Sequence, residues 1–233
     1  MLGPVVVEEL TVIEGLHAAV QLVKHAMAVQ DVRYYLNGIC IEVKDNLADV
    51  VATDGHRMSV VRALPAQCVA AGQYIIPADS TLLLSDDTFS IARIGHREGV
   101  VLGSGSTHLI EGKFPDWRRV IPKPTHSVKV DRDSLMAAVK ASKSGKDWKV
   151  QLDILPDTVT VLFNGSTIAT LPGESNDPAP SLILINGGYL LAALQVQGKG
   201  IVDIGYTPVA NREVPVVGTL LIGDSEIVMP MRR

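Results

Sequence analysis

The sequence of 233 residues has few aromatic side chains, only two cysteines and no long uncharged apolar run. Aromatic residues make up 4% of a chain that is 47% hydrophobic, so any core must be aliphatic. Cys40 and Cys68 match no metal or redox spacing, which indicates a reduced, intracellular protein. No window approaches the roughly 18 apolar residues of a membrane helix, and the first residues lack the pattern of a secretory signal. We therefore predict a cytoplasmic protein.

The chain also lacks an excess of positive charge, because its formal net charge is −4 at pH 7. This value argues against a protein that is coated with basic side chains. It leaves room for a basic stripe on one face, which is what contact with nucleic acid requires.

A short internal sequence repeat indicates two copies of one architecture. Residues 14–21 read EGLHAAVQ and residues 133–140 read DSLMAAVK, so the same residue types recur in the same order about half a chain apart. Both segments are predicted amphipathic helices. The apolar stripe of the first consists of Leu16, Ala19, Val20, Val23 and Met27, and that of the second of Leu135, Ala138 and Val139. Asp133 or Ser134 is the predicted cap of the second helix.

Each half continues with alternating segments and then an apolar strand that leads into a short helix. The strand and helix are QYIIP and ADSTLLLS in the first half, and SLILI and NGGYLLAALQ in the second. The strand-like segments are 35–43, 50–61, 89–94 and 158–171, the last with Asn164-Gly165 as a hairpin turn. We predict an α+β fold of two tandem similar domains, each with two helices on antiparallel sheet. The domains are residues 1–121 and 122–233, joined within the proline-punctuated segment 114–126.

The polar stretch ATDGHR (52–57) allows a catalytic interpretation. His56 with Asp54 and Ser59 resembles parts of a hydrolase triad, but neighbours in a hairpin point to opposite faces or diverge at the turn. The sequence has no phosphate-cradling glycine loop, no HExxH and no CxxC, and its six histidines are scattered. The plainer alternative is a turn whose Asp and Gly satisfy the backbone. We predict no catalytic residue, metal ligand or cofactor.

Four separated segments carry a resemblance to a known family. They are QDVRYYLNGI (30–39), VATDGHRMSV (51–60), LIEGKFPDWRRVIPK (109–123) and VMPMRR (228–233). In order and spacing they resemble signature segments of the bacterial DNA polymerase III β subunit, the sliding clamp. The likeness spans the whole chain and is to the middle and last of the family's usual three domains. It implies a DNA-clamp fold and a protein that catalyses nothing, but encircles duplex DNA and tethers polymerases through a short clamp-binding peptide.

The resemblance implies one hydrophobic peptide-binding pocket at the junction of the two domains. Its positions here are Leu36, Thr53, Gly55, His56, Arg57, Met58, Pro115, Arg119, Val120, Val228, Met229, Pro230, Met231 and Arg232. The unbranched methionines suit a pocket that accepts varied apolar anchors. Burial of two such anchors yields roughly 3–6 kcal/mol before association costs, which predicts weak and exchangeable binding.

The resemblance also implies a DNA-facing set. It consists of Lys24, Gln30, Arg33, Tyr34 and Tyr35, to which Lys140, Lys143, Lys146 and Lys199 could add a basic lining. The alternatives are a strand with one buried face for the tyrosine pair and a solvated face for each lysine. Where the family commonly has a basic pair, this sequence has Ala78-Asp79, with Asp86 and Asp87 nearby. This departure predicts few phosphate contacts and weak retention on DNA at moderate salt.

A homo-oligomeric ring of these chains would close head to tail. Twelve helices about 10 Å wide leave an opening of roughly 28 Å for a duplex roughly 20 Å across, whereas eight leave roughly 15 Å. Two-domain chains therefore predict a trimer, with a splayed dimer as the alternative. The expected partners are double-stranded DNA, a polymerase and other proteins with a clamp-binding peptide, and a clamp loader. The competing hypotheses are a monomeric clamp mimic that binds such peptides without encircling DNA, and a hydrolase that uses His56.

Overall fold

The structure is a computed structural model of the chain, and it describes residues 5–67, 71–83, 87–102, 105–143, 145, 148–209 and 216–231. The chain forms two compact units, residues 1–117 and 118–233. Their division falls within the proline-punctuated segment 114–126. No helix in the described part is long and apolar enough to cross a membrane.

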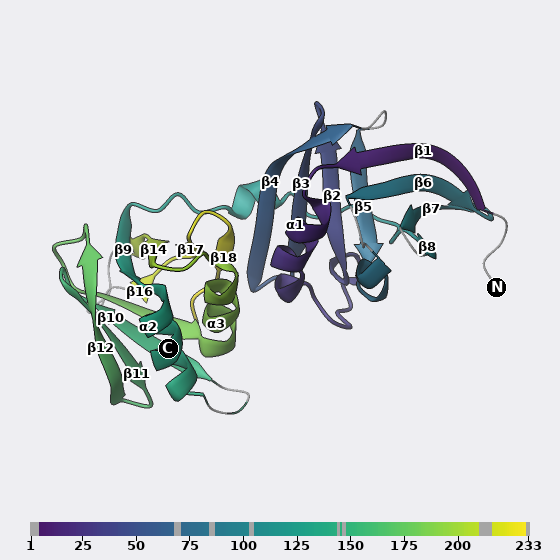
Figure 1. Cartoon of the computed structure of the whole chain (residues 1–233). Coiled ribbons are helices and arrows are strands. Elements are labelled where there is room, and N and C mark those ends of the chain that lie inside the picture. Colours follow the sequence, from purple (N-terminus) through teal and green to yellow (C-terminus); the bar gives the residue numbers. More distant parts are fainter. Residues whose placement is uncertain are drawn as a thin grey trace. The chain divides into compact units, whose positions relative to one another are not determined.

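The described part of unit 1 consists of antiparallel strands with one α-helix, α1 (Leu16–Val23), against them (Figure 1). Its strands are β1 (Val5–Ile13), β2 (Gly38–Lys44), β3 (Leu47–Thr53), β4 (Arg57–Gln67), β5 (Gly72–Pro77), β6 (Thr88–Ile94), β7 (Arg97–Leu102) and β8 (Gly105–His108). They pair in the order β5–β2–β3–β4–β1–β6–β7–β8. The 3-10 helices are η1 (Lys24–Ala26), η2 (Tyr34–Leu36) and η3 (Ala78–Leu83). The helix predicted from ADSTLLLS is thus the 3-10 helix η3.

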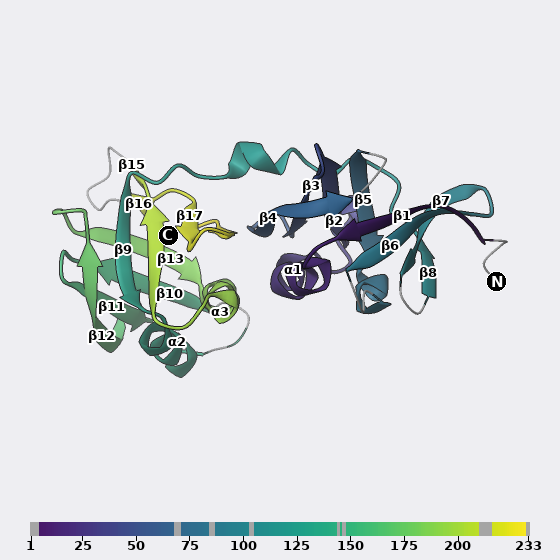
Figure 2. The same cartoon turned by 45° about the horizontal axis from the view of Figure 1, so that its top comes forward.

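Unit 2 repeats this arrangement, and its described residues form two α-helices, α2 (Arg132–Ala141) and α3 (Gly187–Val196), which pack against each other (Figure 2). Its strands are β9 (His126–Asp131), β10 (Lys149–Ile154), β11 (Thr158–Phe163), β12 (Ser166–Ser175), β13 (Ser181–Asn186), β14 (Ile201–Tyr206), β15 (Pro208–Val209), β16 (Val216–Val217), β17 (Leu220–Ile222) and β18 (Glu226–Val228). A short 3-10 helix, η4 (Trp117–Val120), precedes β9.

The two units share one topology. In unit 2 the strands pair in the order β13–β10–β11–β12–β9–β14–β17–β18, which matches the order of unit 1 strand for strand. Strands β15 and β16 extend the sheet of unit 2 at its β13 edge, where β16 runs parallel to β13. The predicted α+β fold of two similar domains is therefore confirmed.

The helices face the sheets with the side chains that the sequence pattern predicts. Leu16, Ala19, Val20 and Val23 of α1 are buried with the inward side chains of β2, β3 and β5. The stripe of α2 belongs to the core of unit 2. Asn164 and Gly165 have φ values of 49° and 78°, as the predicted two-residue hairpin turn between β11 and β12 requires.

A carboxylate far away in the sequence caps α1. Asp87 accepts hydrogen bonds from the backbone N–H groups of Gly15 (2.9 Å, Oδ2) and His17 (3.0 Å, Oδ1). Helix N-termini leave such donors without a partner inside the helix, and a nearby negative charge stabilises them. Asp87, which was named above only as an acidic residue near Ala78-Asp79, therefore has a structural role. Asp86 lies outside the described residues.

The cap predicted for α2 is wrong by two to three residues. The N-cap is Asp131, whose carboxylate accepts a hydrogen bond from the backbone N–H of Ser134 at 2.8 Å. Hydrogen bonding by Ser134 also lowers the pKa of Asp131. Because Asp131, Asp133 and Ser134 are all good capping residues, residue type did not identify the one with extended backbone in front of the helix.

Candidate functional site

The segment TDGHR forms a closed turn between β3 and β4. The hydroxyl of Thr53 accepts a hydrogen bond from Gly55 N at 3.1 Å and donates to the carbonyl oxygen of Arg57 at 2.7 Å. Asp54 Oδ1 accepts from His56 N at 2.8 Å and from Arg57 N at 3.0 Å. Arg57 Nε donates to the other oxygen of this carboxylate at 3.1 Å. Both oxygens of the Asp54 carboxylate thus stabilise the turn. None of these bonds involves the imidazole of His56, so Asp54 gives the hydrolase hypothesis no support.

The predicted peptide-binding residues of unit 1 differ in exposure. Gly55, His56 and Pro115 are exposed. Leu36 and Met58 are only 2% and 3% exposed, so they pack beneath the surface.

The DNA-facing segment of unit 1 is a loop that folds back on itself. The side-chain amide of Asn37 bonds both backbone groups of Asp31, each at 2.9 Å. Tyr34 and Tyr35 lie in η2 with their rings edge to face, so the alternative of a strand is wrong. Tyr34 is 57% exposed. The loop therefore presents an aromatic side chain to solvent on a hydrogen-bonded support.

Arg33 connects this loop to the TDGHR turn. Its guanidinium donates from Nε and Nη2 to the two oxygens of Asp31 at 3.0 and 2.7 Å. Nη2 also donates to the backbone carbonyl of Asp54 at 2.9 Å. The hydrogen bonds from Arg33 lower the pKa of Asp31 to about 2, so the pair is ionised at neutral pH. Two segments that the sequence analysis assigned to different ligands are thus in contact.

The segment that follows β8 covers the sheet of unit 1 with aromatic side chains. Ile110 N donates to the carbonyl of Ile75 in β5 at 2.9 Å, and Trp117 Nε1 donates to Glu42 in β2 at 3.1 Å. Phe114 and Trp117 are 1% and 2% exposed. The conspicuous aromatics of FPDW are therefore core residues.

The predicted peptide-binding residues of unit 2 lie near the first and the last residues of its sequence. Arg119 and Val120 are exposed in η4. Val228 ends β18 and is 1% exposed, whereas Met229 is 51% exposed. Met231 N donates to the carbonyl of Leu184 in β13 at 2.7 Å, which fixes the tail against the sheet. Pro230 and Met231 are half-buried, and Arg232 lies outside the described residues.

The predicted basic lining consists of exposed lysines near the ends of helices. Lys24 follows α1, Lys140 and Lys143 lie at the end of α2, and Lys199 lies between α3 and β14. Lys24 and Lys143 occupy equivalent positions of the repeat, four residues after Val20 and Val139. Gln30 is exposed, and Lys146 lies outside the described residues.

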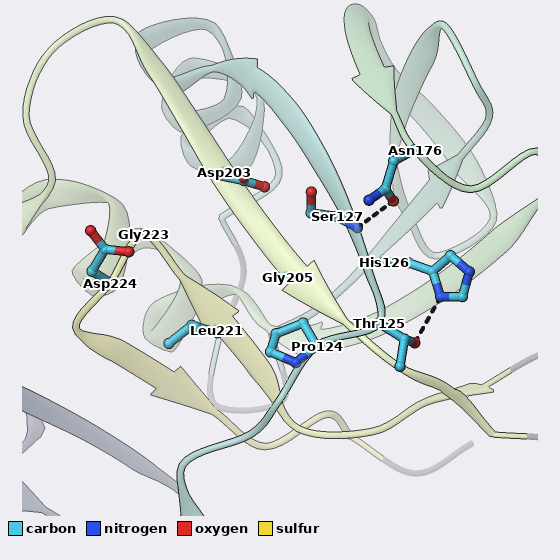
Figure 3. A pocket seen from close by; sticks show the side chains of 10 residues that line it. All are labelled: Pro124, Thr125, His126, Ser127, Asn176, Asp203, Gly205, Leu221, Gly223 and Asp224. Carbon is cyan, nitrogen blue, oxygen red and sulfur yellow. Dashed lines mark hydrogen bonds between the residues drawn. The ribbon is translucent and has the colours of Figure 1, made fainter.

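A pocket of about 220 Å³ in unit 2 was not predicted (Figure 3). The strands β9, β14 and β17 bring its lining together: Pro124, Thr125, His126, Ser127, Asn176, Asp203, Gly205, Leu221, Gly223 and Asp224. Asp203 and Asp224 lie on one side, and Thr125 with His126 on the other, where the Thr125 hydroxyl is 2.9 Å from His126 Nδ1. The pocket contains none of the predicted site residues. Pairing between distant strands creates it, so no local sequence signal could have revealed it.

Among the described residues, no cluster of three His, Cys, Asp or Glu side chains could hold a metal ion. The side chains gathered at the TDGHR turn offer hydrogen bonds, one imidazole and apolar support. This arrangement suits the binding of another macromolecule.

Comparison with known proteins agrees with this geometry. Residues 12–116 match the family described as DNA polymerase III beta subunit, central domain. The beta sliding clamp of Proteus mirabilis is 35% identical over 239 aligned residues, which cover 91% of this chain and 62% of that protein. The beta sliding clamp of Vibrio cholerae is 37% identical over 118 residues, which cover 47% of this chain and 32% of that one. The chain thus spans about one third to two thirds of the length of these curated relatives.

A solved structure of the DNA polymerase sliding clamp from Pseudomonas aeruginosa with ligand superposes with a TM-score of 0.80. It is 28% identical, and the superposition covers 99% of this chain and 68% of that one. Likeness in sequence and in fold extends over both units, which share one strand order. The chain therefore belongs to the bacterial β sliding clamp family, the β subunits of DNA polymerase III.

Proposed function

We propose that the protein is a DNA sliding clamp, a processivity factor that encircles duplex DNA as a ring of several copies. In this proposal it tethers a polymerase and other replication proteins through a peptide-binding surface. The main support is the superposition of 99% of the chain on the Pseudomonas aeruginosa sliding clamp. The clamp catalyses no reaction, and a clamp loader that opens the ring is a further proposed partner.

Two segments are proposed to bind the peptide, the TDGHR turn of unit 1 and the C-terminal tail of unit 2. Hydrogen bonds hold the turn in shape before any ligand arrives, which lowers the entropy cost of binding. Met229 offers an exposed, unbranched side chain on a tail whose backbone is held by the bond from Met231 to Leu184. A fixed backbone with an adaptable side chain suits a site that different apolar anchors share.

The DNA-facing surface is proposed to include the exposed Tyr34 and the lysines at the helix ends. Lys24 and Lys143 recur at the same position of the repeat, so a ring of repeated units would carry a regular series of positive charges. Such charges would contact phosphates without reading sequence, which suits a protein that slides.

Substitution of the tail methionines tests the peptide-binding surface. Met229 is 51% exposed, so covering it removes about half of its surface from water, which is worth about 1 kcal/mol. Met229→Ala should therefore weaken a fluorescent clamp-binding peptide about fivefold, and Met229→Ala with Met231→Ala about tenfold or more. Ile201→Ala is the matched control, because Ile201 is an exposed apolar residue of the same unit at 66%. Equal affinity of the double variant and the control would refute the assignment.

A second candidate is a clamp mimic that captures clamp-binding peptides as a monomer. It is favoured by the net charge of −4 and by the engagement of Arg33 with Asp31 and the turn. Sedimentation equilibrium separates the two proposals, because a ring requires a mass of several chains at micromolar concentration. A single-chain mass throughout that range would leave only the mimic.

A further inference from the structure

Arg33 is held by two partners that lie 23 positions apart in the sequence. Its guanidinium forms a forked pair with the carboxylate of Asp31 and a hydrogen bond with the carbonyl of Asp54. Three donor–acceptor pairs therefore fix the plane of the group. A planar fork of this kind is a property of arginine that lysine cannot reproduce.

The absence of a side chain on Gly55 makes this contact possible. Gly55 has φ = 87°, and a Cβ on it would lie 2.5 Å from Arg33 Nη1 and 2.9 Å from Nη2. The guanidinium thus lies directly against the Gly55 backbone. Gly55 meets two demands at once, a left-handed conformation and room for Arg33.

Several other hydrogen bonds of the turn form within it. Thr53 and the carboxylate of Asp54 satisfy the N–H groups of Gly55 and His56. The carbonyl of Asp54 points outward and is the group that Arg33 reaches. Arg33 therefore connects the turn to the loop that Asn37 braces.

We propose that Arg33 is a positioning residue of the peptide-binding turn, and that it is not one of the DNA phosphate contacts. The inference rests on the proposed function, because it assigns Arg33 to the peptide-binding surface of the clamp. The Asp31 carboxylate already pairs with the guanidinium through Nε and Nη2, so a phosphate would have to compete with an ion pair that is in place. The fork holds Gly55 and His56 in the orientation that a bound peptide meets.

Two substitutions separate a positioning role from a phosphate contact. Arg33→Lys keeps the positive charge and loses the fork, whereas Arg33→Met removes both. Arg97→Lys is the matched control, because Arg97 forms an exposed ion pair with Glu111 elsewhere in unit 1. Each variant is compared with the wild-type chain in three measurements: affinity for a fluorescent clamp-binding peptide, the salt dependence of DNA binding, and amide hydrogen exchange of the free protein.

We expect both Arg33 variants to bind the peptide at least about fivefold more weakly, the loss that corresponds to one hydrogen bond. The amides of Gly55 and His56 should exchange faster in both variants, while those of Val50 and Val51 in β3 stay protected as an internal reference. The slope of log affinity against log salt for DNA should be unchanged in Arg33→Met. Arg97→Lys should match the wild type throughout.

Two results would overturn the inference. One is an Arg33→Lys variant that binds peptide and exchanges its turn amides as the wild type does. The other is a DNA salt slope that falls by about 0.9 in Arg33→Met, the change expected for the loss of one phosphate contact. If the wild type binds no clamp-binding peptide, the proposed function fails. Amide hydrogen exchange of Gly55 and His56 then still decides the inference. Faster exchange in both Arg33 variants supports a positioning role, and unchanged exchange overturns it.

Discussion

Replacement of Asp87 by alanine should destabilise unit 1, because this side chain caps a helix that begins about 70 residues earlier in the chain. Its two carboxylate oxygens accept separate hydrogen bonds from Gly15 N and His17 N. Loss of a capping side chain costs about 0.5–2 kcal/mol, and loss of a negative charge at a helix N-terminus adds about 0.3–1 kcal/mol. We expect a total of about 1–2 kcal/mol, which lowers the unfolding temperature of a unit of this size by roughly 4–10 °C.

The assay is thermal unfolding followed by circular dichroism, with Asp116→Ala as the control at an exposed aspartate of the same unit. Asp87→Asn provides a graded test. Asparagine offers one acceptor oxygen where the carboxylate uses two, so this variant should lie between alanine and the wild type. Equal unfolding temperatures for Asp87→Ala and the control would refute the capping role. An Asp87→Asn variant that holds DNA more tightly without any loss of stability would favour the electrostatic interpretation instead.

Two further predictions concern the stability of unit 2 and the titration of Asp31 at low pH. Gly187→Ala should destabilise unit 2 by about 1–3 kcal/mol in urea unfolding, because a Cβ there would collide with the buried indole of Trp148. Gly198→Ala is the control, because a Cβ on Gly198 would meet open space. Equal urea midpoints for the two variants would contradict the packing of Gly187 against Trp148. The ion pair of Asp31 with Arg33 should titrate with a midpoint near 2 when the Asp31 carboxyl carbon is followed by NMR. Since the folded pKa of Asp31 lies below the ordinary value of 3.8, the pair stabilises the fold above that pH, and this contribution disappears as the pH falls through about 2. A midpoint near 3.8 would show that the pair does not form in solution.

Local patterns in the sequence predicted the elements of the fold. The spacing of Leu135, Ala138 and Val139 predicted the buried face of α2, and these residues are 0%, 6% and 0% exposed. Asn164-Gly165 predicted a hairpin because both residues tolerate positive φ. These signals act within a few residues, so they need no knowledge of the rest of the chain.

Contacts between distant segments were not predictable in this way. The capping role of Asp87 was not predicted, because its partners at the start of α1 are far away in the sequence. The contacts of Arg33 with Gly55 and the carbonyl of Asp54 were not predicted either, because these residues lie more than 20 positions further along the chain. The residue types at the site were thus readable from the sequence, whereas their partners required the fold.

If the protein surrounds DNA as a ring, its retention must depend on whether the DNA is circular or linear. The protein is loaded on nicked circular duplex DNA, with a clamp loader supplied, and separated from free protein by gel filtration at moderate salt. Linearisation with a restriction enzyme then provides ends. A sliding ring stays on the circle and is lost from the linear DNA, because few phosphate contacts hold it. Equal retention on both forms, or no retention on the circle, would contradict the account.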